Sequence, residues 1–197
     1  MTHIATSTRS PERGGFVPVS RSHETDDAAL LARVLAPYKP TCRYLLAAHV
    51  SLCADEAEGE RVVARCELAI PESCYIDDTG HFNSVEFNIC FNQMAYYLVA
   101  KAVKESLIEP FSRWSLEQFW DRQLGDIFIT DFKSSFRSAM SGRHFRGRIE
   151  IADIADWDGN DLRDALVMLR TRCHYWDEQG GESHGEIGAA ITNPPEN

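Results

Sequence analysis

Apolar residues dominate the stretch from 83 to 105, where they occupy nearly every side of a helical projection. A helix of this length that is apolar nearly all round must be buried on most sides. An unpaired buried amide or carboxylate costs on the order of 1–3 kcal/mol, so such groups usually have a partner or a ligand. Polar residues nevertheless gather toward the start of this stretch: His81, Asn83, Glu86, Asn88, Asn92 and Gln93. The pattern predicts a central helix whose first turns carry chemistry.

Runs of β-prone residues flank this helix on both sides. Two of them, joined by the polar segment ADEAEGE, predict a hairpin. The predicted strands are 42–54, 61–70, 126–137, 145–156 and a last one after Gly180–Gly181. Residues 161–176 stay ambiguous, because their first half allows a helix and their second half alternates like a strand.

Two shorter helices complete the pattern. One is predicted at 26–36, with acidic residues at its head and Pro37 at its close, and another at 115–124, with a capping-box signature. Residues 1–25 are predicted to form a mobile tail, so the fold is expected to occupy residues 26–193 as one domain. The remaining β-prone runs can form a curled antiparallel sheet that covers the long helix. The predicted class is therefore α+β, with the hotdog architecture.

Composition places the chain among ordinary globular proteins. Of its 197 residues, 44% are hydrophobic and 25% are charged, which permits a packed core. The formal net charge of -10 argues against general nucleic-acid binding, which depends on Lys and Arg. No apolar run reaches the roughly 18–20 residues that a membrane span needs.

The six cysteines show no CxxC pair and no spacing typical of metal ligands. No signal-peptide pattern precedes them. They are predicted to be reduced, mostly buried thiols of a cytoplasmic protein. The residues imply neither a metal nor another cofactor.

The start of the long helix is the candidate reaction site. Unpaired backbone N–H groups and the positive end of the helix dipole favour negative charge there, including the oxyanion of an acyl transfer. The same dipole is expected to keep His81 neutral and able to accept a proton, while Glu86 orients His81 or a water. A purely structural alternative stays open, because Asn83 as N-cap with Glu86 three residues later forms a capping box.

A helical wheel divides the polar residues into two sets. The stripe of Asn83, Glu86, Cys90, Gln93 and Tyr97 is predicted to line a pocket beside the helix. The opposite set is expected to meet the sheet or a second subunit, and it consists of Asn88, Asn92 and Tyr96. Tyr38 and Tyr75 are placed near the pocket mouth, with simple packing as the alternative for each.

Four stretches of the chain strongly resemble the FcoT-like acyl thioesterase family of actinobacteria: LLARVLAPY, CRYL, ESCYIDDTGHFNSVEFNICFNQMAY and WDEQGGESHGEI. The similarity runs from about 30 to 192. The resemblance implies a hotdog fold that acts on fatty acyl thioesters, and a strand at 161–176. Family members of isonitrile lipopeptide and β-amino acid pathways are similar to (2E)-enoyl-[acyl-carrier-protein] glycyltransferases. Such enzymes would add glycine to C3 of the enoyl thioester and then hydrolyse it, releasing a 3-[(carboxymethyl)amino] fatty acid.

The resemblance also assigns residues. Its substrate pocket matches Tyr38, Tyr75, Asn83, Asn92 and Tyr96, and its GHFN..E element matches His81 and Glu86. Glycine's carboxylate needs a cation, and the segment DFKSSFR offers Lys133 or Arg137, with surface solvation as the alternative.

The expected partners are glycine, an acyl carrier protein or coenzyme A thioester, and a second copy in a homodimer or dimer of dimers. An acidic carrier protein is predicted to dock on the basic patch from Arg143 to Arg148, for which a solvated loop is the alternative. Two other functions stay open: a plain fatty acyl thioesterase, and a non-catalytic acyl-carrier-binding module.

Overall fold

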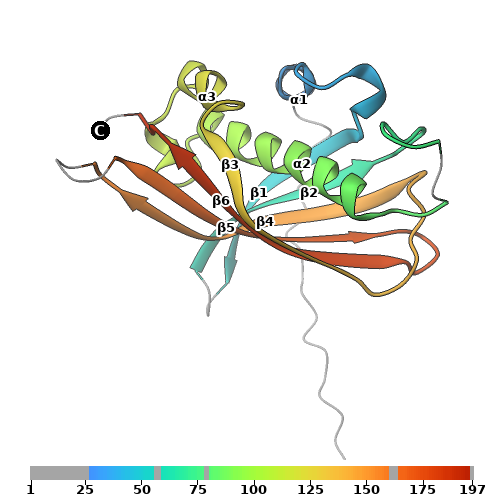
Figure 1. The fold of residues 1–197 in the computed structure, drawn as a ribbon. Helices are drawn as coiled ribbons and strands as arrows, with labels where there is room; N and C mark the ends of the chain where they lie inside the picture. Colours follow the sequence, from blue (N-terminus) through green and yellow to red (C-terminus); the bar gives the residue numbers. More distant parts are fainter. Residues whose placement is uncertain (1–26, 56–58, 78–79, 160–163, 196–197) are drawn as a thin grey trace, which may run out of the picture.

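The computed structural model describes residues 27–55, 59–77, 80–159 and 164–195. Its strands are β1 (Leu45–Asp55), β2 (Gly59–Leu68), β3 (Ile127–Phe136), β4 (Phe145–Trp157), β5 (Leu166–Trp176) and β6 (Glu182–Thr192). Its α-helices are α1 (Ala28–Leu35), α2 (Ser84–Lys104) and α3 (Leu116–Arg122). The strands form one antiparallel sheet in the order β1–β2–β4–β5–β6–β3. Figure 1 shows α2 lying along one face of this sheet, with α1 and α3 on the same side.

This arrangement confirms the predicted α+β hotdog architecture. The hairpin and the long helix lie where the sequence placed them, with boundaries that differ by three residues or fewer. The first strand begins late because Pro40–Cys42 form a 3-10 turn. The predicted tail at 1–25 falls outside the described residues.

The ambiguous segment is a strand from Leu166 onward, as the family resemblance implied. β5 pairs with β4 on one side and β6 on the other, so its backbone groups are satisfied along both edges. Its side chains alternate between the helix side and the outer face of the sheet, beginning with buried Val167 and Leu169. The helical reading is wrong here, because pairing with two neighbouring strands outweighs local helix propensity. Residues 161–163 lie outside the described part of the chain.

Burial of α2 holds the fold together. Thirteen of its 21 residues are buried, as its nearly continuous apolar surface predicted. Its first turns pack into an aromatic cluster, in which the Phe87 ring lies 4.7 Å from the ring of Tyr175 on β5. Gly185 on β6 makes room for this contact, because a Cβ atom there would meet Phe87 Cζ at 2.7 Å. Helix and sheet therefore approach closely at this end of the molecule.

The cysteines are all free thiols. Cys66, Cys90 and Cys173 are buried, and burial raises the pKa of each thiol. Cys42 and Cys53 are half-buried and Cys74 is exposed, so only half of the set fits the prediction of buried thiols. Within the described ranges, no helix is both long and apolar enough to cross a membrane.

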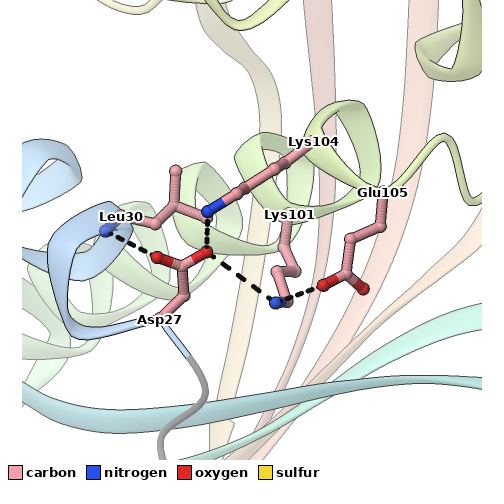
Figure 2. Close-up of polar contacts among 5 residues, drawn as sticks. All are labelled: Asp27, Leu30, Lys101, Lys104 and Glu105. Atoms are coloured by element: carbon pink, nitrogen blue, oxygen red, sulfur yellow. Dashed lines mark hydrogen bonds and ion pairs between the residues drawn. The ribbon is translucent and has the colours of Figure 1, made fainter.

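Asp27 ties the start of α1 to the end of α2, as Figure 2 shows. Its carboxylate accepts a hydrogen bond from Leu30 N at 3.1 Å and pairs with Lys104 and with Lys101, whose Nζ lies 3.9 Å away. Lys101 also pairs with Glu105. Burial raises the pKa of Asp27, but the bond from Lys104 and the other contacts outweigh it, and the pKa falls below its ordinary value of 3.8.

We expect Asp27→Asn to lower the free energy of unfolding by about 1–3 kcal/mol at pH 7. The amide can still cap Leu30, so the loss reports the missing charge beside two lysines. Because the folded-state pKa is depressed, the carboxylate contributes its stability above pH 3.8 and loses it as the pH falls through the folded pKa. Urea unfolding at pH 7 and pH 3 measures both effects. Asp121→Asn, at an exposed position of α3, is the control, and equal losses in the two variants would contradict the assignment.

Candidate active site

A hollow of about 270 Å³ opens at the N-terminal end of α2. Three segments form it: the loop after β2, the loop that enters α2 with its first turn, and the loop before β4. Its polar and charged lining includes Glu72, Ser73, Asp77, His81, Glu86 and Arg143. The structure therefore brings the predicted pair His81 and Glu86 together in one recess.

Hydrogen bonds between the loops give the hollow a defined wall. Ile70 N donates to Gly142 O at 2.7 Å, which joins the loop after β2 to the loop before β4. Arg143 Nη1 donates to Pro71 O at 2.6 Å across the same junction. These two bonds hold the Arg143 side chain at the rim of the recess.

Phe82 anchors the loop that carries His81. Its side chain is 1% exposed, and its ring lies 4.9 Å from Phe145 and 5.2 Å from Tyr175. Two residues earlier, Gly80 has φ +72, a conformation that residues with a side chain rarely adopt. The buried Phe82 thus fixes the backbone beside His81, while the imidazole itself stays exposed at the hollow.

Asn83 caps α2, so the structural alternative holds for this residue. Its Oδ1 accepts hydrogen bonds from Val85 N at 3.0 Å and Glu86 N at 3.3 Å. Its Nδ2 donates to Glu86 Oε2 at 3.1 Å, which orients a carboxylate that is only 4% exposed. The expectation of unpaired N–H groups in the first turn is therefore wrong for Val85 and Glu86, since the cap already uses both donors.

The stripe predicted to line a pocket divides in the structure. Glu86 lines the hollow, whereas Cys90, Gln93 and Tyr97 are buried in the core. Gln93 is fully buried and binds the backbone of the β1 approach: its Oε1 accepts from Tyr44 N and Leu45 N, each at 2.9 Å. Cys90, Gln93 and Tyr97 therefore do not line the hollow as the helical wheel predicted, and the main chain at the start of β1 packs against Gln93 instead.

The second set of polar residues on α2 was predicted to meet either the sheet or a second subunit, and in the structure Asn92 and Tyr96 of this set face the sheet. Asn92 and Tyr96 line a narrow apolar groove of about 30 Å³ between α2 and strands that include β3. Asn92 Nδ2 also donates to Asn88 Oδ1 at 3.1 Å. Burial, followed by the nearby Tyr96 hydroxyl, raises the pKa of Tyr38, so these two tyrosines lie close together. Of the predicted substrate residues, Asn92 and Tyr96 therefore line this groove, and Tyr38 lies near Tyr96.

Three predicted residues lie elsewhere. Tyr75, half exposed, stands on the connection between β2 and α2. Lys133 and Arg137 line a separate depression over β3, β5 and β6, and Lys133 Nζ lies 3.9 Å from a Glu186 carboxylate oxygen. The structure therefore does not place either cation with His81, and their predicted contact with glycine stays a prediction.

The basic patch is distributed over two places. Arg143 lines the hollow, while Arg146 and Arg148 lie on β4, where Arg146 Nη2 is 3.9 Å from Glu178. The sequence marked Arg143 only as one of several neighbouring arginines. Glu72 and Asp77 were missed as well, because in the sequence they belong to a turn-rich connection.

One cluster of described residues has the side chains for a metal ion: His174, Glu182 and His184, with ligand atoms within 4.8 Å of one another. The two imidazole rings are stacked, with centroids 4.2 Å apart and an interplanar angle of 4°. A ligating imidazole lone pair lies in the plane of its ring, and parallel planes share no point for one ion. This geometry does not form a metal site, and the cluster stands on β5 and β6, apart from the lining of the hollow.

The FcoT-like thioesterase domain family matches residues 33–191. A protein from Streptomyces coeruleorubidus, named (2E)-enoyl-[ACP] glycyltransferase, is 49% identical over 172 residues, which cover 86% of this chain and 99% of that protein. A protein of the same name from Mycobacterium marinum is 36% identical and covers 84% of this chain and 86% of its own. Among solved structures, a proposed thioesterase from Syntrophus aciditrophicus covers 83% of this chain and 94% of its own, with 11% identity and a TM-score of 0.46.

Proposed function

Because the chain belongs to the FcoT-like thioesterase family, we propose that it adds glycine to C3 of a (2E)-enoyl thioester on an acyl carrier protein and then hydrolyses the thioester. The product is a 3-[(carboxymethyl)amino] fatty acid. The observation that carries this proposal is the polar hollow at the start of α2, which both His81 and Glu86 line. The name of the 49% identical relative supports it.

In the first step, the glycine amine must lose a proton to become a nucleophile. His81 accepts that proton, and Glu86, held by Asn83, assists through the imidazole or a water. The amine nitrogen forms a bond to C3, and the C2–C3 π electrons move onto the thioester oxygen as an enolate. C2 then takes up a proton from the imidazolium, which restores neutral His81 and the thioester.

In the second step, the same pair activates water. Hydroxide adds to the thioester carbonyl, the C–S bond breaks, and the carrier thiol leaves with a proton. The GxSxG match at residues 181–185 is not a nucleophile elbow, because Ser183 lies inside strand β6 and is fully buried, and not at an exposed strand-to-helix turn. This fits direct attack by water without an acyl-enzyme. One base therefore serves both steps.

We infer that the fatty chain lies along the apolar groove of Tyr96 and Asn92. Asn92 stands six residues after Glu86, or about 9 Å along the helix axis. A groove of about 30 Å³ is far smaller than the roughly 300–1,000 Å³ of ligand pockets, so it contacts only part of the chain, and the rest of the chain needs a further surface. Phe128, 47% exposed at the groove, is the point where a second subunit of a homodimer would supply that surface. Tyr38 is expected beside the chain and Tyr75 at the mouth.

An acidic carrier protein is repelled by a chain of net charge -10 unless it docks locally on basic residues. We assign that role to Arg146 and Arg148 on β4, which follow the Arg143 loop directly. The six free thiols are compatible with the reducing cytoplasm as the place of reaction.

Mass spectrometry tests the proposal. Purified protein is incubated with a short (2E)-enoyl thioester on carrier protein, with and without isotopically labelled glycine. We expect a free acid that carries the label. Release of the unmodified enoyl acid at the same rate with and without glycine would identify a plain thioesterase, and no turnover of any thioester would identify an acyl-carrier-binding module.

A further inference from the structure

We propose that Arg143 binds the carboxylate of glycine inside the hollow and thereby presents the glycine amine to His81. The inference rests on the proposed function and adds a binding site for its second substrate. Its basis is that Arg143, His81 and Glu86 line the same recess, although Arg143 stands more than fifty residues after the other two in the chain.

The surrounding backbone positions the guanidinium. Nη1 of Arg143 donates to Pro71 O at 2.6 Å, and the main-chain N of Arg143 donates to Ser141 Oγ at 3.3 Å. A guanidinium carries five N–H donors in a fixed plane, so it can serve several acceptors at once, and the bond to Pro71 sets its orientation. The planar fork of arginine matches the two oxygens of a carboxylate.

The loop that carries Arg143 is itself fastened at its base. Asp177 Oδ2 accepts from Ser141 N at 2.7 Å, and Asp177 Oδ1 accepts from Gly181 N at 2.8 Å. Burial raises the pKa of Asp177, but these backbone donors outweigh it and hold the pKa below its ordinary value. Asp177 therefore stays ionised and keeps the loop before β4 against the turn before β6.

The charges around the recess fit an amino acid zwitterion. Arg143 supplies a cation for the carboxylate, while Glu72, Asp77 and Glu86 supply carboxylates that attract an ammonium group. A volume of about 270 Å³ lies just under the roughly 300–1,000 Å³ of pockets for drug-sized ligands, so it suits a small polar molecule together with the reacting end of the thioester. The charge pattern orients glycine with its amine on the side of His81 and Glu86.

Arg143 also fits this role better than the cations predicted from the sequence. The side chain of Lys133 is 78% exposed, and Lys133 and Arg137 line a depression that His81 does not line. A carboxylate bound there would hold its amine away from the imidazole.

The test compares glycine with glycinamide, which keeps the amine and lacks the carboxylate charge. For the wild type and each variant, kcat/KM for adduct formation is measured with glycine and with glycinamide on one enoyl carrier thioester. The ratio of variant to wild type is then calculated separately for each amine. We expect Arg143→Gln to lose roughly 10- to 150-fold with glycine, the value of a charged hydrogen bond, and a few-fold at most with glycinamide. Arg146→Gln and Lys133→Gln are the matched controls and should treat both amines alike.

Each other result overturns the assignment. Equal losses with both amines in Arg143→Gln would mean that Arg143 does not bind the carboxylate, and a glycine-specific loss in Lys133→Gln would move the site to that depression. If Arg143→Gln does not fold, Arg143→Lys retains the charge without the fork, and it should raise KM for glycine but not for glycinamide. If the wild-type protein forms no adduct with glycine, the proposed function itself is refuted. If the wild type forms the adduct but Arg143→Gln loses the same factor with both amines, only this inference is refuted.

Discussion

Replacing His81 by alanine is expected to lower kcat/KM for glycine addition by roughly 10²- to 10⁴-fold, the usual contribution of a positioned general base. The loss arises because glycine is mainly an ammonium ion near neutral pH and must be deprotonated before its nitrogen can attack. Since the His81 side chain is exposed and Phe82 anchors the loop, the free energy of unfolding should change by no more than about 0.5 kcal/mol. Activity and stability are therefore expected to respond separately.

The measurement is adduct formation under single-turnover conditions, alongside urea unfolding of the same preparation. His144→Ala is the matched control, since this histidine is also exposed and stands beside Arg143 in the loop before β4. Thioester hydrolysis is followed in parallel, and it should fall with glycine addition if one base serves both steps. A His81→Ala variant that retains wild-type rates would remove His81 from the chemistry and leave Glu86 as the remaining candidate.

The largest effect on stability is expected from Gln93→Leu, with a loss of about 3–6 kcal/mol in the free energy of unfolding. Gln93 accepts hydrogen bonds from Tyr44 N and Leu45 N and donates to Cys42 O at 2.6 Å. Leucine fills a similar volume but leaves two N–H groups and a carbonyl without this partner, each at about 1–2 kcal/mol, which lies within the usual cost of an unpaired buried group. Against a typical total of about 5–15 kcal/mol, this is a severe loss.

Chemical unfolding of Gln93→Leu tests this. Asn92→Leu is the matched control, because it removes an amide one residue away on a half-buried face, where its partner is Asn88 on the same helix. A smaller loss in Gln93→Leu than in Asn92→Leu would contradict the view that Gln93 joins α2 to the start of β1.

The secondary structure was largely predictable because its signals are local. An apolar surface on nearly every side of 83–105 requires burial wherever the helix lies, and the polar ADEAEGE segment between β-prone runs predicts a hairpin without knowledge of its neighbours. Asn83 followed by Glu86 carries a capping signal in the sequence itself, and the structure shows Asn83 as the N-cap. By contrast, 161–176 had no decisive local signal, and β4 and β6 made most of it a strand by pairing with it.

The site was predictable only in part. The sequence by itself determined that a buried helix begins beside His81 and Glu86, since both residues and the helix lie within one short segment. The tertiary structure decided which distant groups face that segment: it placed Gln93 against the backbone of Tyr44 and brought Arg143 into the hollow. A helical wheel fixes the direction of a side chain but not what stands opposite it. That depends on how loops far apart in the chain meet, because the charges and hydrogen-bond groups that complete a site act through space and not along the sequence.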